Sequence, residues 1–175
     1  THYLSFGTAG LRGVMKTGMN AMNTHTVAYA TQALAELIRR EGKSAAGVVI
    51  AYDCRNHSQE FARTAASVLA AADIPVYLFD ELRPTPELSF ALRHLHCVAG
   101  INITASHNPR QYNGYKAYWE DGAQVTAPID KDIITEVQSI KDYHTVKTMS
   151  REDAVAAGLY EVIGKEIDDK YMAEL

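Results

Sequence analysis

The sequence predicts an α/β fold: a three-layer α/β/α domain whose mainly parallel, mixed sheet of about four strands is covered by helices on both faces. Three observations support this prediction. Helix-like and strand-like patterns alternate along the chain, which is typical of parallel sheets with crossover helices. The strand-like runs are short and apolar throughout, as in strands buried on both faces. The 175 residues suffice for one well-buried domain and are too few for two ordinary ones.

The first helix and the first strand follow a long opening that is rich in Gly, Thr and Asn and shows no helical or strand period. Asn23 or Thr24 can cap a helix that runs to about Arg40, because apolar residues then recur at the three- and four-residue spacing of one helix face. Gly42 is a suitable residue to end it. Residues 47–52 are a continuous apolar run with β-branched side chains, so they predict a buried strand.

Two further helices and two further strands are expected next. Ser58 is expected to cap a second helix that ends near residue 73. Residues 74–79 predict a short strand, and a third helix is expected over roughly residues 87–95, behind a proline at its first position. Residues 98–103 are again apolar and β-branched, so they predict a third buried strand.

The remaining elements are less sharply marked. Residues 115–119 predict a further strand closed by a Glu-Asp-Gly turn, and a fourth helix is expected over residues 128–140. Short helical signals follow, and residues 167–175 begin a helix without a stop signal. We therefore expect residues 1–160 to form the domain and residues 161–175 to begin a connection to a missing second domain.

Composition and charge exclude several classes of protein. The formal net charge is −4 with acidic and basic residues interleaved, and no basic cluster with aromatic residues marks a nucleic-acid surface. The longest apolar runs are far too short to span a bilayer, and we see no secretory signal. Cys54 and Cys97 make no disulfide framework. We therefore expect a cytoplasmic protein with no nucleic-acid partner and no membrane partner.

The segment Thr-Ala-Ser-His-Asn-Pro-Arg-Gln-Tyr-Asn-Gly-Tyr-Lys, residues 104–116, carries the residue types that chemistry needs. It begins where the predicted strand 98–103 ends, and ligands of open α/β sheets bind beyond the carboxyl ends of strands. The loop is expected to project Ser106 and His107 and to return Lys116 close to them.

Two interpretations of this loop follow from the residues alone. A serine hydroxyl is a poor nucleophile unless a base, a cation or a metal assists it, and His107, Lys116 and Arg12 could assist Ser106 if the fold brings them together. The alternative is a polar surface loop whose Ser, Asn and Thr side chains satisfy their own backbone. Generic chemistry leaves both interpretations open.

Four motifs resemble those of one enzyme family. Residues 104–109 and 112–116 are similar to the active-serine signature of the α-D-phosphohexomutases, the phosphoglucomutase and phosphomannomutase family. The other three resemble the opening hallmark of that family's first domain, its D-x-R-x-x-S segment and its proline turn, and lie at residues 6–13, 52–58 and 83–86. The motifs follow the family's order and span about two-thirds of the chain.

The resemblance implies that the chain is the first domain of such an enzyme. Ser106 would be the phosphorylated serine, which donates its phosphoryl group to the sugar and recovers one from the intermediate. The catalytic residues that it implies are Ser106, His107, Lys116 and Arg12. The residues that it implies for substrate or phosphate binding are Thr8, Arg12, Asn108 and Lys116. Lys116 and His107 are both candidates for the general base. A phosphoserine carries about −1.5 to −2 charges at neutral pH, so nearby cations suit it.

The resemblance also implies a cofactor and partners. One Mg²⁺ per site would be bound by a phosphate oxygen on Ser106 and by three aspartates of a second domain, whose D-x-D-x-D loop does not occur in this sequence. A hexose 1,6-bisphosphate would serve as primer and intermediate. The expected partners are a phosphosugar substrate and the remaining domains of the same enzyme. We expect little or no mutase activity from this chain alone, because catalysis needs metal, sugar and phosphate contacts held together.

The implied reaction interconverts a hexose 1-phosphate and a hexose 6-phosphate, with glucose weakly favoured over mannose. The alternatives are a phosphopentomutase, an amino-sugar phosphate mutase, or a non-catalytic phosphosugar-binding relative. A non-catalytic relative should have lost Ser106 or Lys116, and both are present. Residues 115–124 are most similar to phosphoglucomutase and phosphopentomutase relatives. Arg55 and Ser58 are expected to be structural, because a helix cap explains Ser58.

Overall fold

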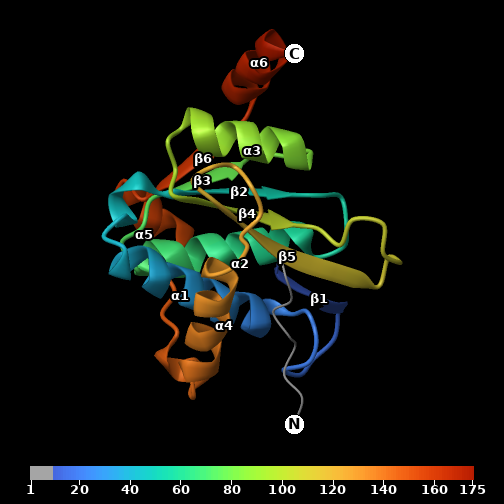
Figure 1. Ribbon diagram of the computed structural model, residues 1–175, viewed down its shortest axis with the longest axis vertical. Helices are drawn as coiled ribbons and strands as arrows, with labels where there is room; N and C mark the ends of the chain where they lie inside the picture. Colours follow the sequence, from blue (N-terminus) through green and yellow to red (C-terminus); the bar gives the residue numbers. More distant parts are fainter. Residues whose placement is uncertain (1–9) are drawn as a thin grey trace.

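Residues 10–175, which the computed structural model describes, form a three-layer α/β/α domain around one six-stranded sheet (Figure 1). The strand order in the sheet is β1-β5-β4-β2-β3-β6. β2 pairs in parallel with β3 and β4, β3 pairs in parallel with β6, and β5 runs antiparallel to both β4 and β1. The strands are β1 (Gly10–Val14), β2 (Val48–Tyr52), β3 (Val76–Phe79), β4 (Ala99–Ile103), β5 (Tyr112–Trp119) and β6 (Tyr160–Ile163).

Helices cover both faces of the sheet (Figure 1). α1 and α2 lie together on one face, with α4 packed against α1 and α5 against α2. α3 lies on the other face, and α6 packs against it. The helices are α1 (Thr24–Arg40), α2 (Ser58–Ala71), α3 (Thr85–His94), α4 (Ile129–Ser139), α5 (Arg151–Ala156) and α6 (Lys165–Glu174).

The mixed, mainly parallel sheet between two helix layers confirms the predicted fold class, but the predicted number of strands is wrong. The sheet of the described residues has six strands and not about four. The two strands that the sequence did not predict, β1 and β6, are the edge strands. β1 contains two glycines and an arginine, and it is a strand because it pairs along β5. β6 leaves two of its four residues exposed. Neither has the apolar run that marks a buried strand.

The core lies on both faces of the central strand β2. Val48, Ile50 and Tyr52 belong to the larger apolar cluster, which α1 and α2 share. Val49 and Ala51, which alternate with them, belong to a second cluster under α3. This burial on both faces explains why the strand is a continuous apolar run in the sequence.

The helix starts agree with the sequence in one case and contradict it in another. Asn23 caps α1 as predicted: its side chain accepts the Thr26 N–H at 3.0 Å, and its own N–H donates to Thr26 Oγ1. The cap predicted at Ser58 is wrong. His57, with φ of 63°, precedes α2 without a side-chain cap. The Ser58 hydroxyl instead donates to the Asp53 carboxylate at 2.8 Å, so it belongs to the site described below.

The last two elements extend the packing beyond residue 160. β6 begins at Tyr160 and adds a strand beside β3, with Ile163 paired to Phe79. α6 then packs against α3, where Ile167 is buried in the cluster under that helix. The division of the chain at residue 160 stays a prediction.

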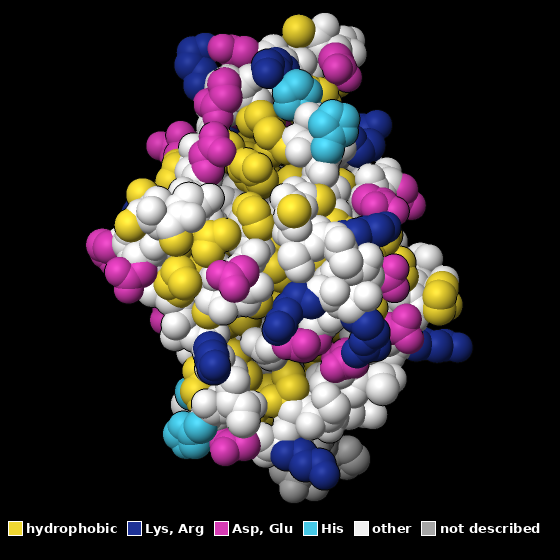
Figure 2. Space-filling view, turned by 90° about the vertical axis from the view of Figure 1, so that its left-hand side faces the viewer, with side chains coloured by type: hydrophobic (Ala, Val, Ile, Leu, Met, Phe, Trp, Pro, Cys, Tyr) yellow, Lys and Arg dark blue, Asp and Glu magenta, His cyan; other side chains and the backbone are white. Residues whose placement is uncertain are grey.

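The surface carries both signs of charge. Figure 2 shows acidic and basic side chains interspersed over one face, with hydrophobic atoms between them. This distribution agrees with the interleaved charges of the sequence. No helix among the described residues combines the length and the hydrophobicity that a bilayer crossing requires.

Candidate active site

The loop that carries Ser106 begins at the edge of the sheet where the parallel strands β2 and β4 both end. Tyr52 is paired with Ile103, and the Asp53 N–H donates to the Ile103 carbonyl oxygen at 3.2 Å. The chain therefore leaves both strands side by side. We call residues 104–111, between β4 and β5, the serine loop, and residues 53–57, between β2 and α2, the Asp53 segment.

Ser106 is exposed in the serine loop and has a left-handed backbone conformation. Its φ is 55°, a region that costs a residue other than glycine on the order of 1 kcal/mol. Its N–H donates to Thr104 Oγ1 at 3.0 Å, which offsets part of this cost. Its Oγ lies 3.4 Å from Nδ1 of His107, so the two predicted catalytic side chains are neighbours. The hydroxyl is therefore open to a ligand, with an imidazole beside it.

Arg55 of the Asp53 segment holds the serine loop in place through its backbone. The guanidinium donates to the carbonyl oxygens of Ser106 at 2.6 Å and Asn108 at 2.7 Å, and to those of Pro109 at 3.0 Å and Tyr112 at 3.2 Å. The sequence predicted a structural role for Arg55 but not its target. The sequence signal for this contact is the D-x-R pattern of Asp53 and Arg55 directly after a buried strand. The sequence does not show that this strand, β2, lies beside β4, the strand that precedes Ser106.

Arg12 and Lys116 lie on the same face of the sheet, beside the serine loop. Arg12 of β1 is paired with Gly114 of β5, and Lys116 of β5 is paired with Gly10 of β1. Paired residues and alternate residues of a strand share a face, so the two cations project to the same side. Arg12 Nη1 lies 3.5 Å from Oδ1 of Asn108, a long contact that links β1 to the serine loop.

The amine of Lys116 has a lowered pKa. Partial burial is the largest cause, the positive charge of Arg12 acts in the same direction, and the carboxylate of Asp53 opposes both. These three charges therefore lie within electrostatic range of one another. A lysine with a lowered pKa is more readily neutral, so it can accept a proton at a lower pH than free lysine.

Most of the predicted site residues meet in this region. Ser106, His107 and Asn108 share the serine loop, and Arg12 and Lys116 flank it. Thr8 lies outside the described residues. Within residues 10–175, no hydrogen bond joins Ser106 to Arg12 or Lys116.

A complete metal site is not present in residues 10–175. No group of three or more His, Cys, Asp and Glu side chains there could bind a metal ion. The carboxylate of Asp53, which lies beside the Arg55 that contacts the serine loop, already has Arg55 and Ser58 as partners. The described residues alone therefore do not fit Mg²⁺, and a phosphate on Ser106 is the ligand that this region could contribute.

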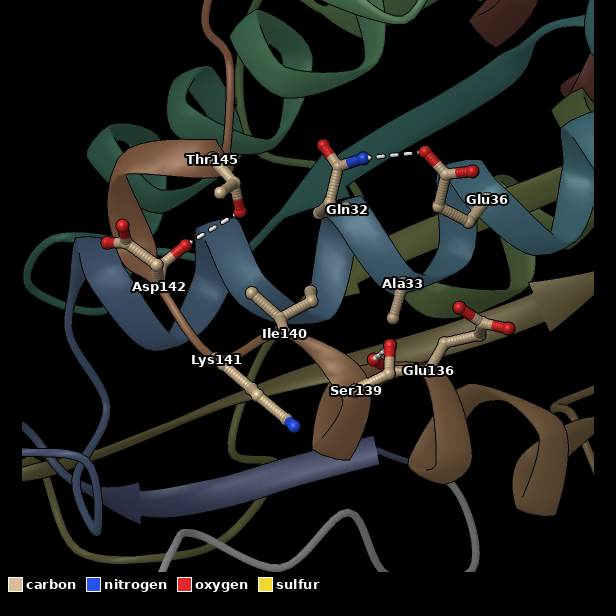
Figure 3. A pocket seen from close by; sticks show the side chains of 9 residues that line it. All are labelled: Gln32, Ala33, Glu36, Glu136, Ser139, Ile140, Lys141, Asp142 and Thr145. Atoms are coloured by element: carbon tan, nitrogen blue, oxygen red, sulfur yellow. Dashed lines mark hydrogen bonds between the residues drawn. The ribbon is translucent and has the colours of Figure 1, made fainter.

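A separate pocket of about 460 Å³ lies between α1 and the α4 region (Figure 3). Its two glutamates already have partners. Glu36 accepts from Gln32 at 2.9 Å and from Arg39 at 3.1 Å, and Glu136 pairs with Arg40. The pocket contains none of the predicted site residues, so we do not assign it to the chemistry of Ser106.

The sequence matches one protein family over most of its length. Residues 3–144 match the family described as phosphoglucomutase/phosphomannomutase, alpha/beta/alpha domain I. An alignment of 138 positions with the phosphopentomutase of Homo sapiens shows 45% identity and covers 74% of this chain and 22% of that protein. An alignment of 176 positions with a phosphoglucomutase of Staphylococcus epidermidis shows 44% identity and covers 86% of this chain and 30% of that protein.

The fold also matches solved structures. A Thermus thermophilus structure described as a phosphomannomutase has a TM-score of 0.76 and 30% identity, and the match covers 93% of this chain and 33% of that one. Among the sequence relatives, a glucose 1,6-bisphosphate synthase of Mus musculus is 45% identical in an alignment of 139 positions that covers 75% of this chain and 22% of that protein. The chain thus spans between a fifth and a third of the length of these relatives.

Proposed function

Because this chain belongs to the phosphoglucomutase/phosphomannomutase family, as its α/β/α domain I, we propose that Ser106 carries the phosphoryl group in a phosphosugar mutase reaction. The observation that carries the proposal is the serine loop itself. It presents an exposed serine in a fixed backbone conformation, with His107 beside it and two cations on the adjoining face of the sheet. Phosphoryl transfer depends mainly on positioning and charge neutralisation, which these residues can provide.

The proposed reaction has two transfers. In the first, the P–O bond to Ser106 Oγ breaks, a P–O bond to the free hydroxyl of the sugar phosphate forms, and the proton of that hydroxyl passes to a base. Ser106 Oγ takes up a proton as it leaves, so the products are a sugar bisphosphate and a free serine hydroxyl. In the second transfer, the Ser106 hydroxyl gives its proton to a base and its Oγ takes the other phosphoryl group of the bisphosphate. A general acid returns a proton to the sugar oxygen that is released, and Ser106 is phosphorylated again. The result is a hexose 6-phosphate from a hexose 1-phosphate.

We propose Lys116 as the base of the first transfer. Its lowered pKa makes the neutral amine more accessible than in an ordinary lysine, whereas Nδ1 of His107 lies 3.4 Å from Ser106 Oγ itself. Arg12 would neutralise the phosphate on Ser106, and Asn108 would orient the loop by its contact with Arg12. Thr8 is proposed as a further phosphate contact from the family motif. Bound Mg²⁺ supplies positive charge to phosphate oxygens, and carboxylates outside this chain would complete its coordination.

A pentose phosphate is the second candidate substrate. The 45% identity to a phosphopentomutase is as high as that to any of the compared hexose enzymes. None of the residues that we assign to the site contacts the part of the sugar that differs between a hexose and a pentose, so this chain does not decide between the substrates. We therefore propose a hexose phosphate, glucose before mannose, and keep the pentose phosphate as the alternative. We also propose a cytoplasmic setting.

The test uses the gene product that contains this chain. Wild type and Ser106→Ala would be assayed with Mg²⁺ and a sugar 1,6-bisphosphate primer on glucose 1-phosphate, mannose 1-phosphate and a pentose 1-phosphate. We expect Ser106→Ala to lower kcat on the order of 10³-fold or more, as loss of a covalent nucleophile does. The preferred substrate would decide between the candidates. A Ser106→Ala variant that keeps wild-type activity would reject the phosphoserine mechanism.

A second test concerns the chain by itself. We propose that the 175 residues alone have little or no mutase activity, because residues 10–175 provide no carboxylate cluster for Mg²⁺. The chain would be assayed beside the gene product at equal concentration. Turnover by the chain within about tenfold of the gene product would contradict this proposal, since catalytic positioning is expected to require the other contacts.

A further inference from the structure

We propose that Arg55 is a positioning residue for the proposed phosphoryl transfer: it fixes the backbone of the serine loop, and with it the place of the Ser106 hydroxyl, without itself touching sugar or phosphate. This inference rests on the proposed function, because it assigns Arg55 a part in that reaction. Three features carry it: the contacts of Arg55, the residues that hold it, and the peptide group that it orients.

The guanidinium of Arg55 faces four backbone carbonyl oxygens and no side-chain acceptor of the serine loop. The bonds to Ser106 and Asn108, at 2.6 and 2.7 Å, have the short lengths of charge-assisted hydrogen bonds. The bonds to Pro109 and Tyr112, at 3.0 and 3.2 Å, reach the end of the loop and the start of β5. One planar group therefore holds both ends of the turn that carries the serine. A lysine ammonium, which has three donors and no planar fork, cannot serve four acceptors in this way.

Arg55 is itself held in place. Its backbone N–H donates to Asp53 Oδ1 at 3.0 Å, and its Nε lies 3.4 Å from Asp53 Oδ2. The Arg55 side chain is only 13% exposed. Asp53 Oδ1 also accepts the Ser58 hydroxyl at 2.8 Å, which ties the carboxylate to the first turn of α2. The cation is therefore paired, mostly buried and connected to the helix layer.

A second anchor holds the far side of the serine loop. Asn113, which is fully buried, donates from Nδ2 to the Ser58 hydroxyl at 2.9 Å and to the Asn56 carbonyl oxygen at 3.2 Å. Its Oδ1 accepts the Gly114 N–H at 2.8 Å. β5 is thus fastened to the Asp53 segment independently of Arg55. Loss of Arg55 should therefore loosen the serine loop and leave the strand in place.

The carbonyl contact of Ser106 also orients a donor. In a trans peptide the C=O and the following N–H point in opposite directions, so the N–H of His107 points away from Arg55. Within residues 10–175 this N–H makes no hydrogen bond. It is therefore available to an anionic oxygen bound to Ser106 Oγ, as backbone amides commonly are at phosphate sites. Arg55 thus sets the position of the hydroxyl and the direction of an adjacent donor together.

Loss of Arg55 should affect the chemical step. A displacement of a reacting group by about 1 Å can cost on the order of 100-fold in rate. Because Arg55 contacts backbone only within the serine loop, its loss should lower kcat and leave the KM for the sugar phosphate within about threefold.

The experiment compares Arg55→Lys, Arg55→Ala, Ser106→Ala and the control Arg63→Ala in the gene product that contains this chain. Arg63 is an exposed arginine on α2, outside the serine loop. The readouts are kcat, KM, thermal unfolding, and the fraction of Ser106 phosphorylated after incubation with a sugar 1,6-bisphosphate, measured by mass spectrometry. Guanidinium chloride at millimolar concentration would be added to Arg55→Ala to replace the missing group.

We expect kcat to fall about 10- to 100-fold in Arg55→Lys and further in Arg55→Ala, with lower phosphorylation of Ser106, partial rescue by guanidinium, and no change in Arg63→Ala. Both Arg55 variants folded and at wild-type kcat would overturn the inference. Arg55→Ala that merely unfolds, with Arg55→Lys folded and fully active, would also overturn it, because the role would then be structural. If Ser106→Ala stays active, the proposed function fails whatever Arg55 does.

Discussion

At the scale of single residues, the lowered pKa of Lys116 predicts how the activity of the proposed site depends on pH. A general base must be neutral, so kcat should rise as pH rises through the pKa of Lys116. Burial and the charge of Arg12 lower this pKa, so the rise should occur at a lower pH than for an ordinary lysine. Arg12→Gln removes one of the two causes and should move the rise to higher pH. Lys116→Met should lower kcat about 10²- to 10⁴-fold and abolish the rise.

The measurement is the pH profile of kcat in the gene product for wild type, Arg12→Gln and Lys116→Met. A rise that stays at the same pH in Arg12→Gln would show that Arg12 does not act on the pKa of Lys116. A rise that persists in Lys116→Met would assign the base elsewhere, with His107 as the remaining candidate.

A second residue-scale prediction concerns Gly114, where β5 passes between β1 and β4. A Cβ at this position would lie 2.6 Å from the Thr104 carbonyl oxygen and 3.0 Å from that of Leu11, and both are backbone atoms that cannot move aside easily. Gly114→Ala should therefore lower the free energy of unfolding of the 175-residue chain by about 1–3 kcal/mol. Urea denaturation would measure it.

The control is Gly42→Ala. A Cβ at Gly42 meets nothing within 4 Å, and its φ of 69° adds only the cost of a left-handed alanine, about 1 kcal/mol. If Gly114→Ala destabilises the chain no more than Gly42→Ala, the close approach of the strands at Gly114 is not a constraint.

The sequence predicted where Ser106 lies in the fold but not which residues hold its loop, and the catalytic role of Ser106 stays a proposal. A serine in a turn directly after a buried strand is visible in the pattern, and so is its neighbour His107. The partner of Arg55 is a set of carbonyl oxygens more than fifty positions away, and backbone acceptors leave no trace in residue types. Ser58 differs from its predicted role as a cap for another reason: its partner, the carboxylate of Asp53, is set by how the chain turns after β2.

At the scale of elements, the contact between β5 and α1 predicts two unequal substitutions. Tyr115 is fully buried, and its hydroxyl lies 3.2 Å from Thr31 Oγ1, which also donates to the Val27 carbonyl oxygen at 2.7 Å. Burial also raises the pKa of Tyr115, so the phenol stays neutral. Tyr115→Phe removes one hydrogen bond and leaves Thr31 with its other partner, so it should cost about 1 kcal/mol. Thr31→Val leaves a buried phenol without a partner and should cost more, about 1–3 kcal/mol.

Urea denaturation of the two variants and of the double variant would check this order. Equal costs, or a larger cost for Tyr115→Phe, would show that the phenol finds another partner after the threonine is lost. In the double variant both groups are replaced by apolar ones, so its cost should be smaller than the sum of the single costs.

The sequence predicted those elements whose own residues form a recognisable apolar pattern. α1 and β2 have a periodic stripe and a continuous apolar run, and both are found close to their predicted bounds. β1 and β6 depend on a neighbouring strand. β1 is extended because its backbone pairs with β5, and β6 is extended because its backbone pairs with β3. β5 also begins earlier than the predicted residue 115, at Tyr112, because residues 112–114 already pair with β1.

At the scale of the whole molecule, the candidate site is assembled from four separate segments. Arg12 comes from β1, Arg55 follows β2, Ser106 follows β4, and Lys116 lies in β5. The parallel pairing of β2 and β4 brings two of these segments to one edge, although the sequence did not show that these two strands are neighbours. The antiparallel placement of β5 between β4 and β1 brings Lys116 and Arg12 to the same site. This placement depends on the edge strand β1, whose sequence has no apolar run that would predict a strand.

The packing of α6 on the rest of the molecule predicts a dependence of stability on pH. Arg83, before α3, donates to Asp168 of α6 at 2.6 and 2.9 Å. Glu87 of α3 lies beside this pair, is 5% exposed, and its Oε1 has no hydrogen-bond partner within the described residues. Burial, and next the neighbouring Asp168, raise the pKa of Glu87 from 4.5 to about 7, while Arg83 opposes the rise.

The sign follows from the raised value. The folded chain binds the proton of Glu87 more tightly than the unfolded chain does, so the stability that this proton contributes is complete below about pH 4.5 and is lost as pH rises through about 7. Glu87→Gln keeps a neutral side chain at every pH and removes this loss. Between about pH 5 and about pH 8, the free energy of unfolding of the wild-type chain should therefore fall relative to that of Glu87→Gln, on the order of 1–2 kcal/mol. Urea denaturation of both chains at several pH values would measure it. Parallel profiles would mean that the carboxyl of Glu87 ionises at its ordinary pH, and that α6 is held on α3 without a protonated group between them.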